Sequence, residues 1–228
     1  MKPLLTLTLV GAAALSIAAT AKAAPLRIRG AVVAISAKAL TVHTPRGNVT
    51  TALKPNTAFV SVVPSNLSHV GPGSYLGVAS KNAGDRLVAL SVIVFPPSMK
   101  GASEGHAAYD VLPDTTLSGG ARTASSMTNA NVKTISARQS EPGVNSTMTN
   151  GSVANAAAKG GVKLLTLTYK GGEQNVLVPP TAPIVAFVPG PASIVRPGAA
   201  VFVQADETNG KASAMLVAVG SHGLTPPF

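Results

Sequence analysis

An internal repeat constrains the fold of this 228-residue chain more than any other feature of its sequence. Residues 57–64 read TAFVSVVP, and residues 181–189 read TAPIVAFVP, which differs mainly by one inserted proline. Leu40 likewise aligns with Leu165, 125 positions later, and a Pro-Gly pair follows each repeat at matching positions. Self-similarity of this kind is the mark of a repeated structural unit. We therefore predict two copies of one unit.

Each copy reads as a series of short strands. The segments are rich in Val, Ile, Thr and Leu, are separated by Gly, Pro and Asn turns, and show no long amphipathic helical pattern. A unit of this size can close into a small β-barrel, which removes exposed strand edges. The predicted strands are 27–36, 39–44, 48–53, 57–63, 75–80 and 86–95 in the first copy, and 148–154, 164–169, 174–178, 183–188, 200–205 and 212–219 in the second.

Four segments follow from this pattern. Residues 1–23 are predicted to be a signal peptide, 24–98 a first small β-barrel, 99–147 a long polar linker and 148–228 a second small β-barrel. The linker is rich in Ser, Thr, Asn, Gly and Ala, a composition that buries little apolar surface. We therefore expect an all-β protein of two tandem barrels.

The order of apolar and turn residues resembles an exported bacterial domain family of unknown function, present here as two tandem copies. The resemblance rests on Gly30-x-Val32, Leu40-Thr41-Val42, Thr57, Pro72-Gly73 before Tyr75, and Ala89. It implies small barrels similar to an OB fold. It covers about two thirds of the chain and carries no catalytic residue across, because a fold alone does not define a function.

The first residues read as an export signal. Lys2 precedes an apolar run that ends near Ala19, and Ala21-Lys22-Ala23 offers the small side chains that signal peptidase requires. We expect the mature chain to begin at Ala24 and to lie in the periplasm, with the cell exterior as the alternative. No later uncharged apolar run approaches the roughly 20 residues of a membrane-spanning helix, so we expect no such span. The chain has no Cys, which excludes disulfides and thiolate metal sites.

The predicted linker holds the most function-like group of polar residues. Glu104, His106 and Asp110 offer oxygen and nitrogen ligands for a divalent metal, and Met99 could add a soft ligand for copper. The four histidines of the chain show no spacing that constrains ligand geometry. The alternative is a structural role, in which His106 helps to hold the linker against a barrel through hydrogen bonds.

A serine hydrolase pattern is present but is rejected. Residues 101–105 match G-x-S-x-G around Ser103, and Asp206 and His222 follow in the order that such enzymes use. That motif requires a strand and a helix to clamp the turn that exposes the serine. Here Pro96-Pro97 precede it and no helical pattern follows. We therefore predict that the protein is not an enzyme.

Positive charge is concentrated in the first predicted barrel. Residues 24–98 carry seven basic side chains against one acidic one, Asp85. Arg27 and Arg29 share a strand face because side chains alternate along a strand, and this face could attract an anionic envelope component. Net charge that serves only solubility is the alternative. Nucleic acid is disfavoured, because single-strand binders need aromatic platforms and aromatic residues make up 4% of this chain.

These observations predict a non-catalytic periplasmic binding or interaction module. The alternative is a periplasmic protein that handles a divalent metal through Glu104, His106 and Asp110. Its partner would be an anionic envelope component or another periplasmic protein. The sequence leaves open the identity of the ligand, the oligomeric state and whether the two barrels pack together.

Overall fold

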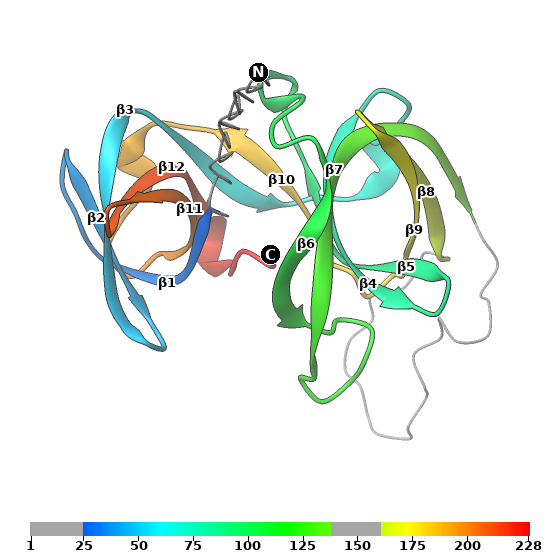
Figure 1. The fold of residues 1–228 in the computed structure, drawn as a ribbon, viewed down its shortest axis with the longest axis horizontal. Helices are drawn as coiled ribbons and strands as arrows, with labels where there is room; N and C mark the ends of the chain where they lie inside the picture. Colours follow the sequence, from blue (N-terminus) through cyan, green and yellow to red (C-terminus); the bar gives the residue numbers. More distant parts are fainter. Residues whose placement is uncertain (1–24, 138–160) are drawn as a thin grey trace, which may run out of the picture.

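The computed structural model of the protein describes residues 25–137 and 161–228, and they form an all-β structure, as predicted (Figure 1). Short 3-10 turns at Leu67–His69, Pro97–Met99, Ala192–Ile194 and Ser221–Gly223 connect the strands. No helix within these two ranges is long and apolar enough to cross a membrane. The strands are β1 (Leu26–Ile35), β2 (Ala39–Thr44), β3 (Gly47–Pro64), β4 (Tyr75–Ala83), β5 (Arg86–Val94), β6 (Gly105–Pro113), β7 (Arg122–Ala137), β8 (Lys163–Tyr169), β9 (Gly172–Val178), β10 (Ile184–Pro189), β11 (Ala200–Thr208) and β12 (Lys211–Gly220).

Five strands from the two ends of the chain form a closed barrel. Strands β1, β2, β3, β12 and β11 pair in this order around the circuit, and β11 returns to β1; we call them the terminal barrel. Strands β5, β4, β7, β8 and β9 pair in a second circuit, here called the middle ring, which β9 closes by a short parallel pairing with β5. Strand β10 joins the two, because it pairs with β3 on one side and β5 on the other (Figure 1).

Strand pairing crosses the boundary between the two sequence copies. Strands β4 and β5, which belong to the range 24–98, pair with β7 and β9 of the middle ring and not with β1 to β3. Strands β11 and β12, from the range 148–228, complete the terminal barrel instead. The physical reason is the length of β3. It is a single strand of 18 residues where the sequence suggested two, and its last residues pair with β10 outside the terminal barrel.

Residues 125 positions apart in the sequence hold equivalent places in the strand pairing of the two circuits. In the contact between β3 and β10, Val62 lies opposite Phe187, so two positions related by this spacing meet in the middle of the molecule. The parallel pair Phe59 and Val217 has its counterpart in Ile184 and Val92. The register shift after Ala79 in β4 recurs after Gln204 in β11. The two circuits are therefore related by an approximate twofold arrangement of their hydrogen bonds.

The predicted linker contains two strands, β6 and β7, and this corrects the sequence-based assignment of 99–147. Strand β7 holds the place in the middle ring that β1 holds in the terminal barrel, because it pairs with β8 and β4 as β1 pairs with β2 and β11. Its inward residues Thr128, Ala130 and Val132 are buried in strict alternation. Small side chains can line a narrow barrel even where the composition is polar. The strand predicted at 148–154 lies outside the described residues.

The three largest apolar clusters of the core lie one inside each circuit and one between the circuits. The cluster of the terminal barrel includes Leu40 and Val203, and that of the middle ring includes Leu76 and Leu165. The third cluster is richer in aromatic residues and comprises Val60, Val62, Ile93, Val185, Phe187, Phe202, Ala218 and Phe228. The last residues of the chain run between the two circuits (Figure 1), which brings Phe228 into this third cluster.

Candidate functional site

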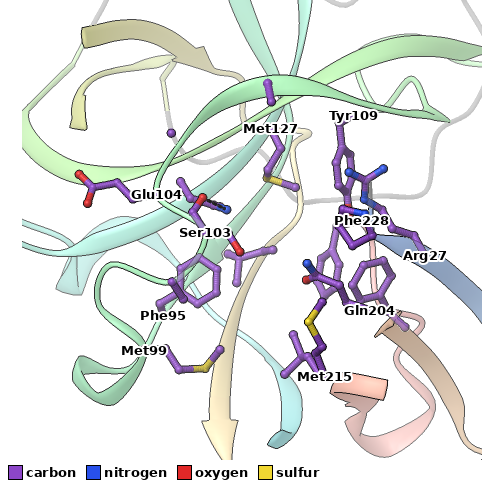
Figure 2. A pocket seen from close by; sticks show the side chains of 18 of the residues that line it. Arg27, Phe95, Met99, Ser103, Glu104, Tyr109, Met127, Gln204, Met215 and Phe228 are labelled. Carbon is purple, nitrogen blue, oxygen red and sulfur yellow. Dashed lines mark hydrogen bonds between the residues drawn. The ribbon is translucent and has the colours of Figure 1, made fainter. Parts of the chain in front are cut away.

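A cavity of about 710 Å³ opens beside the third apolar cluster, where the terminal barrel and the middle ring face each other (Figure 2). Strands β11 and β12 supply one wall and β6 and β7 the opposite one. Residues from β5, β10 and the end of the chain lie between the walls. The lining residues are Pro25, Arg27, Ala58, Ile93, Phe95, Met99, residues 102–109, Met127, Asn129, Phe187, Phe202, Gln204, Asp206, Met215, Leu216 and Phe228.

Large apolar side chains are concentrated at this cavity. The chain has five phenylalanines, and four of them line it: Phe95, Phe187, Phe202 and Phe228. Every methionine of the described ranges lines it as well, namely Met99, Met127 and Met215. These residues come from six different parts of the chain. The cavity therefore cannot be recognised from the sequence, because only the exchange of strands between the circuits brings these residues together.

The aromatic rings of the cavity form a continuous chain. Phe95 and Phe187 lie 5.3 Å apart between ring centroids, Phe187 and Phe228 lie 5.5 Å apart, and Phe228 and Phe202 lie 5.1 Å apart, all edge to face. Tyr75 extends the chain at 5.5 Å from Phe95. Edge-to-face pairs at these distances are favourable beyond the area they bury. The rings therefore form a tightly packed apolar wall, in which Phe187, Phe202 and Phe228 are only 4%, 4% and 2% exposed.

Arg27 and Arg29, the predicted anion-binding residues, both pair with Asp110, a predicted metal ligand. Arg27 Nη1 lies 2.8 Å from Asp110 Oδ1, and Arg29 Nη2 lies 2.6 Å from Asp110 Oδ2. Arg29 Nε also donates to the main-chain oxygen of Phe228 at 2.6 Å. All three charged side chains are partly buried, with 20–34% of each exposed. One carboxylate thus bridges two guanidinium groups, and the cluster joins β1 of the terminal barrel to β6.

Tyr109 covers this charge cluster on the side of β6. The Arg27 guanidinium lies 4.3 Å from the centre of the Tyr109 ring, within the range of a cation–π contact. Burial raises the pKa of the Tyr109 hydroxyl to about 12, although the two arginines act in the opposite direction. The phenol therefore stays neutral through the physiological range. Both arginines of the cluster therefore already have partners, in Asp110 and in the main-chain oxygen of Phe228.

The remaining predicted metal ligands point to different partners. Glu104 Oε1 accepts a hydrogen bond from the main-chain N–H of Lys170 at 3.0 Å. His106 Nδ1 lies 2.8 Å from the hydroxyl oxygen of Thr128 on β7, which corresponds to the structural alternative considered for this histidine. Together with the pairing of Asp110, this leaves the three side chains in three separate interactions. Within residues 25–137 and 161–228, no group of three or more His, Asp or Glu side chains is placed to hold a metal ion.

The residues of the hydrolase pattern are not assembled into a triad. Ser103 and Asp206 both line the cavity, whereas His222 lies in an exposed 3-10 turn away from its lining. No hydrogen bond connects any two of these three described residues. Nucleophilic catalysis by a serine requires a base within hydrogen-bonding reach of its hydroxyl. Ser103 does adopt a left-handed backbone conformation with φ of 49°.

No family model matches the chain, and no curated protein or solved structure is significantly similar to it. The resemblance to an exported OB-like family therefore stays a prediction, and the function has to be argued from the site itself.

Proposed function

We propose that the protein is a non-catalytic binding protein that holds an apolar small molecule in the cavity between its two circuits. The observation that carries this proposal is the gathering of four phenylalanines and three methionines around one volume of about 710 Å³. Binding sites for small molecules have volumes of this order and are lined mainly by apolar and aromatic side chains with a few polar groups. Methionine adapts its shape to a ligand more readily than branched side chains do.

The side-chain geometry favours this function over metal handling. Glu104, His106 and Asp110 are each engaged with a different partner, so a metal ion would have to break existing hydrogen bonds and ion pairs. It also favours an apolar ligand over an anionic one. Arg27 and Arg29 are already neutralised in part by Asp110, which lowers their attraction for an external anion.

We further propose that the protein acts in the periplasm and arose by duplication of an OB-like unit. The leader at residues 1–23, with its Ala-Lys-Ala sequence, supports export, although it lies outside the described residues. The matching registers of the two circuits support duplication, and the five-strand closure of the terminal barrel is compatible with an OB-like unit.

A pair of matched substitutions on β3 tests the binding site. Ala58 and Ala52 are both exposed residues of this strand, but only Ala58 lines the cavity. We expect the uncharged fluorescent probe N-phenyl-1-naphthylamine to bind the full chain saturably, Ala58→Trp to weaken binding at least tenfold by filling the cavity, and Ala52→Trp to leave it unchanged. Absence of saturable binding, or equal effects of the two tryptophans, would contradict the proposal.

A further inference from the structure

We infer that the ligand of this cavity carries a positively charged amino group on its apolar body. The inference rests on the proposed function, because it concerns the polar part of the same site. It is drawn from the balance of hydrogen-bond donors and acceptors around the cavity. The few polar groups that line an apolar site fix the orientation of its ligand, so an unpaired one indicates what the ligand supplies.

One acceptor without a partner lines this cavity where a ligand can reach it. Asp206 and Gln204 line it from β11, and neither side chain forms a hydrogen bond or ion pair with any described residue. Asn129 lines the opposite side, and its Oδ1 atom is buried without a hydrogen-bond partner, whereas its Nδ2 donates to the main-chain oxygen of Ser103. The Asn129 oxygen faces Gly77, where a Cβ atom would lie 2.7 Å from it, so it is closed to a ligand. The Asp206 carboxylate is therefore the acceptor that calls for a donor. Gln204 can donate or accept.

The cations near the cavity are already occupied. Arg27 is the only Lys or Arg among the lining residues, and it is paired with Asp110 at 2.8 Å. Glu104 is the other lining carboxylate, and Figure 2 shows its side chain turned away from Phe95 and Gln204, in accord with its hydrogen bond to Lys170. Asp206 is therefore the charge that a ligand inside the cavity would meet. This acidic position stands out in a chain whose net charge is +10.

The aromatic lining favours a cation for an independent reason. The faces of aromatic rings attract cations, and the attraction grows when the cation is removed from water. Arg29 already uses this effect, because its guanidinium carbon lies 5.0 Å from the centre of the Phe202 ring. Phe187 and Phe228 are 4% and 2% exposed and are covered by other side chains. Phe95 is only partly buried and has no such contact with a described Lys or Arg, so its ring is open to a ligand. An ammonium group near Asp206 would thus gain a carboxylate partner in a cavity that is partly aromatic.

Three ligands of one shape test the inference on the full chain. They share a naphthalene ring and differ in charge: 2-(2-naphthyl)ethylammonium, uncharged methyl 2-naphthylacetate and anionic 2-naphthylacetate. We expect calorimetric titration at pH 7 to give the ammonium ligand an affinity about tenfold higher than that of the ester, in line with one charged hydrogen bond, and the anion the weakest binding. Asp206→Asn should weaken binding of the ammonium ligand about tenfold and leave binding of the ester unchanged.

Glu207→Gln is the matched control, because it removes the same charge from the neighbouring position of β11, which does not line the cavity. It should change none of the three affinities. The charge assignment would be overturned if the ammonium and the ester bound equally well, or if the Asp206 and Glu207 variants lost affinity for the ammonium ligand equally. Either result would leave the apolar binding function intact. Failure of all three ligands to bind would overturn both proposals.

Discussion

At the scale of single residues, two carboxylates hold β6 and the turn after it between the two circuits. Asp110 on β6 pairs with Arg27 and Arg29 of the terminal barrel. Asp114, just beyond β6, pairs with Lys81 of β4 in the middle ring at 2.6 Å. The Asp114 side chain is only 4% exposed and that of Lys81 17%, so this second pair is nearly removed from water. Charged residues that the sequence suggested as ligand contacts instead form ion pairs that hold one wall of the cavity in place.

Lys81→Met should destabilise the protein strongly. It leaves the Asp114 carboxylate buried without its charged partner, which in comparable sites costs about 3–5 kcal/mol. Lys133→Met is the matched control, because the Lys133–Glu173 pair is much more exposed, at 59% and 40%, and should contribute about 0–1 kcal/mol. Denaturant unfolding of both variants at pH 7 measures the difference. Similar losses of unfolding free energy in the two variants would show that burial of the Lys81–Asp114 pair does not increase its contribution to stability.

Lowering the pH should reduce the difference in unfolding free energy between the wild type and Lys81→Met. Burial pushes the pKa of Asp114 upward, but hydrogen bonds from Lys81 and Thr116 outweigh it and hold the pKa below its ordinary value of 3.8. A carboxyl group with a lowered pKa stabilises the fold above the unfolded pKa, and this contribution is lost as the pH falls through the folded pKa. In the variant the buried carboxyl lacks its charged partner, so its pKa is raised and the variant gains stability as the pH falls. We therefore expect the stability difference to shrink steadily from about pH 7 to about pH 3. A difference that does not vary down to pH 2 would rule out this role of the carboxylate.

At the scale of secondary structure, the strands rich in Val, Ile and Leu could be predicted from sequence and the small-residue strands could not. Strand β2 was predicted with its observed bounds, and β1, β4, β5, β8 and β12 to within a few residues, because β-branched residues and turn signals mark them. Strand β7 was missed since Thr128 and Ala130 fill barrel positions that a hydrophobicity pattern does not recognise. Strand β6 was missed because most of its side chains are at least partly exposed. The cavity could not be predicted, since one of its walls consists of these two strands.

Gly220→Ala should detach the end of the chain from its position between the circuits. Gly220 ends β12, and a Cβ atom there would lie 1.6 Å from the main-chain oxygen of Leu224, too close for any rotamer change to relieve. The segment that carries Phe228 would have to move, at a cost of roughly 1–3 kcal/mol. We expect a lower midpoint of thermal unfolding together with weaker binding of N-phenyl-1-naphthylamine.

Gly190→Ala is the control for this substitution, because a Cβ atom at Gly190 would meet only side-chain atoms of Ile194, at 3.3 Å. It should reduce stability less and leave probe binding unchanged. A Gly220→Ala protein as stable as Gly190→Ala, with full probe binding, would show that the last residues do not shape the cavity.

At the scale of the whole molecule, the exchange of strands means that neither half of the chain can bury its core alone. The core of the terminal barrel combines Leu40 and Val42 with Val203 and Val217, which lie far along the chain. The core of the middle ring is equally mixed. The halves are therefore held together by two shared cores and by β10, in addition to the covalent connection (Figure 1).

Cutting the chain between residues 138 and 160 should therefore leave one folded particle. A protease site inserted there would separate 25–137 from 161–228, two fragments that share the pairings of β1 with β11, β3 with β12 and β5 with β9. We expect the cut protein to elute from a sizing column at the position of the intact chain and to unfold in one transition. Fragments that separate without denaturant would contradict the strand exchange.

The central claim is that the cavity between the two circuits binds an apolar ligand, and methionine methyl NMR tests it most directly. Met99, Met127 and Met215 all line the cavity, so three methyl groups report on it from different strands and loops. The full chain labelled with ¹³C at its methionine methyl groups would be titrated with N-phenyl-1-naphthylamine, and the three resonances assigned by Met→Leu substitutions. We predict that all three shift together and saturate with one dissociation constant. Saturable probe binding that leaves these three resonances in place would mean that the ligand binds elsewhere, and the account would be wrong.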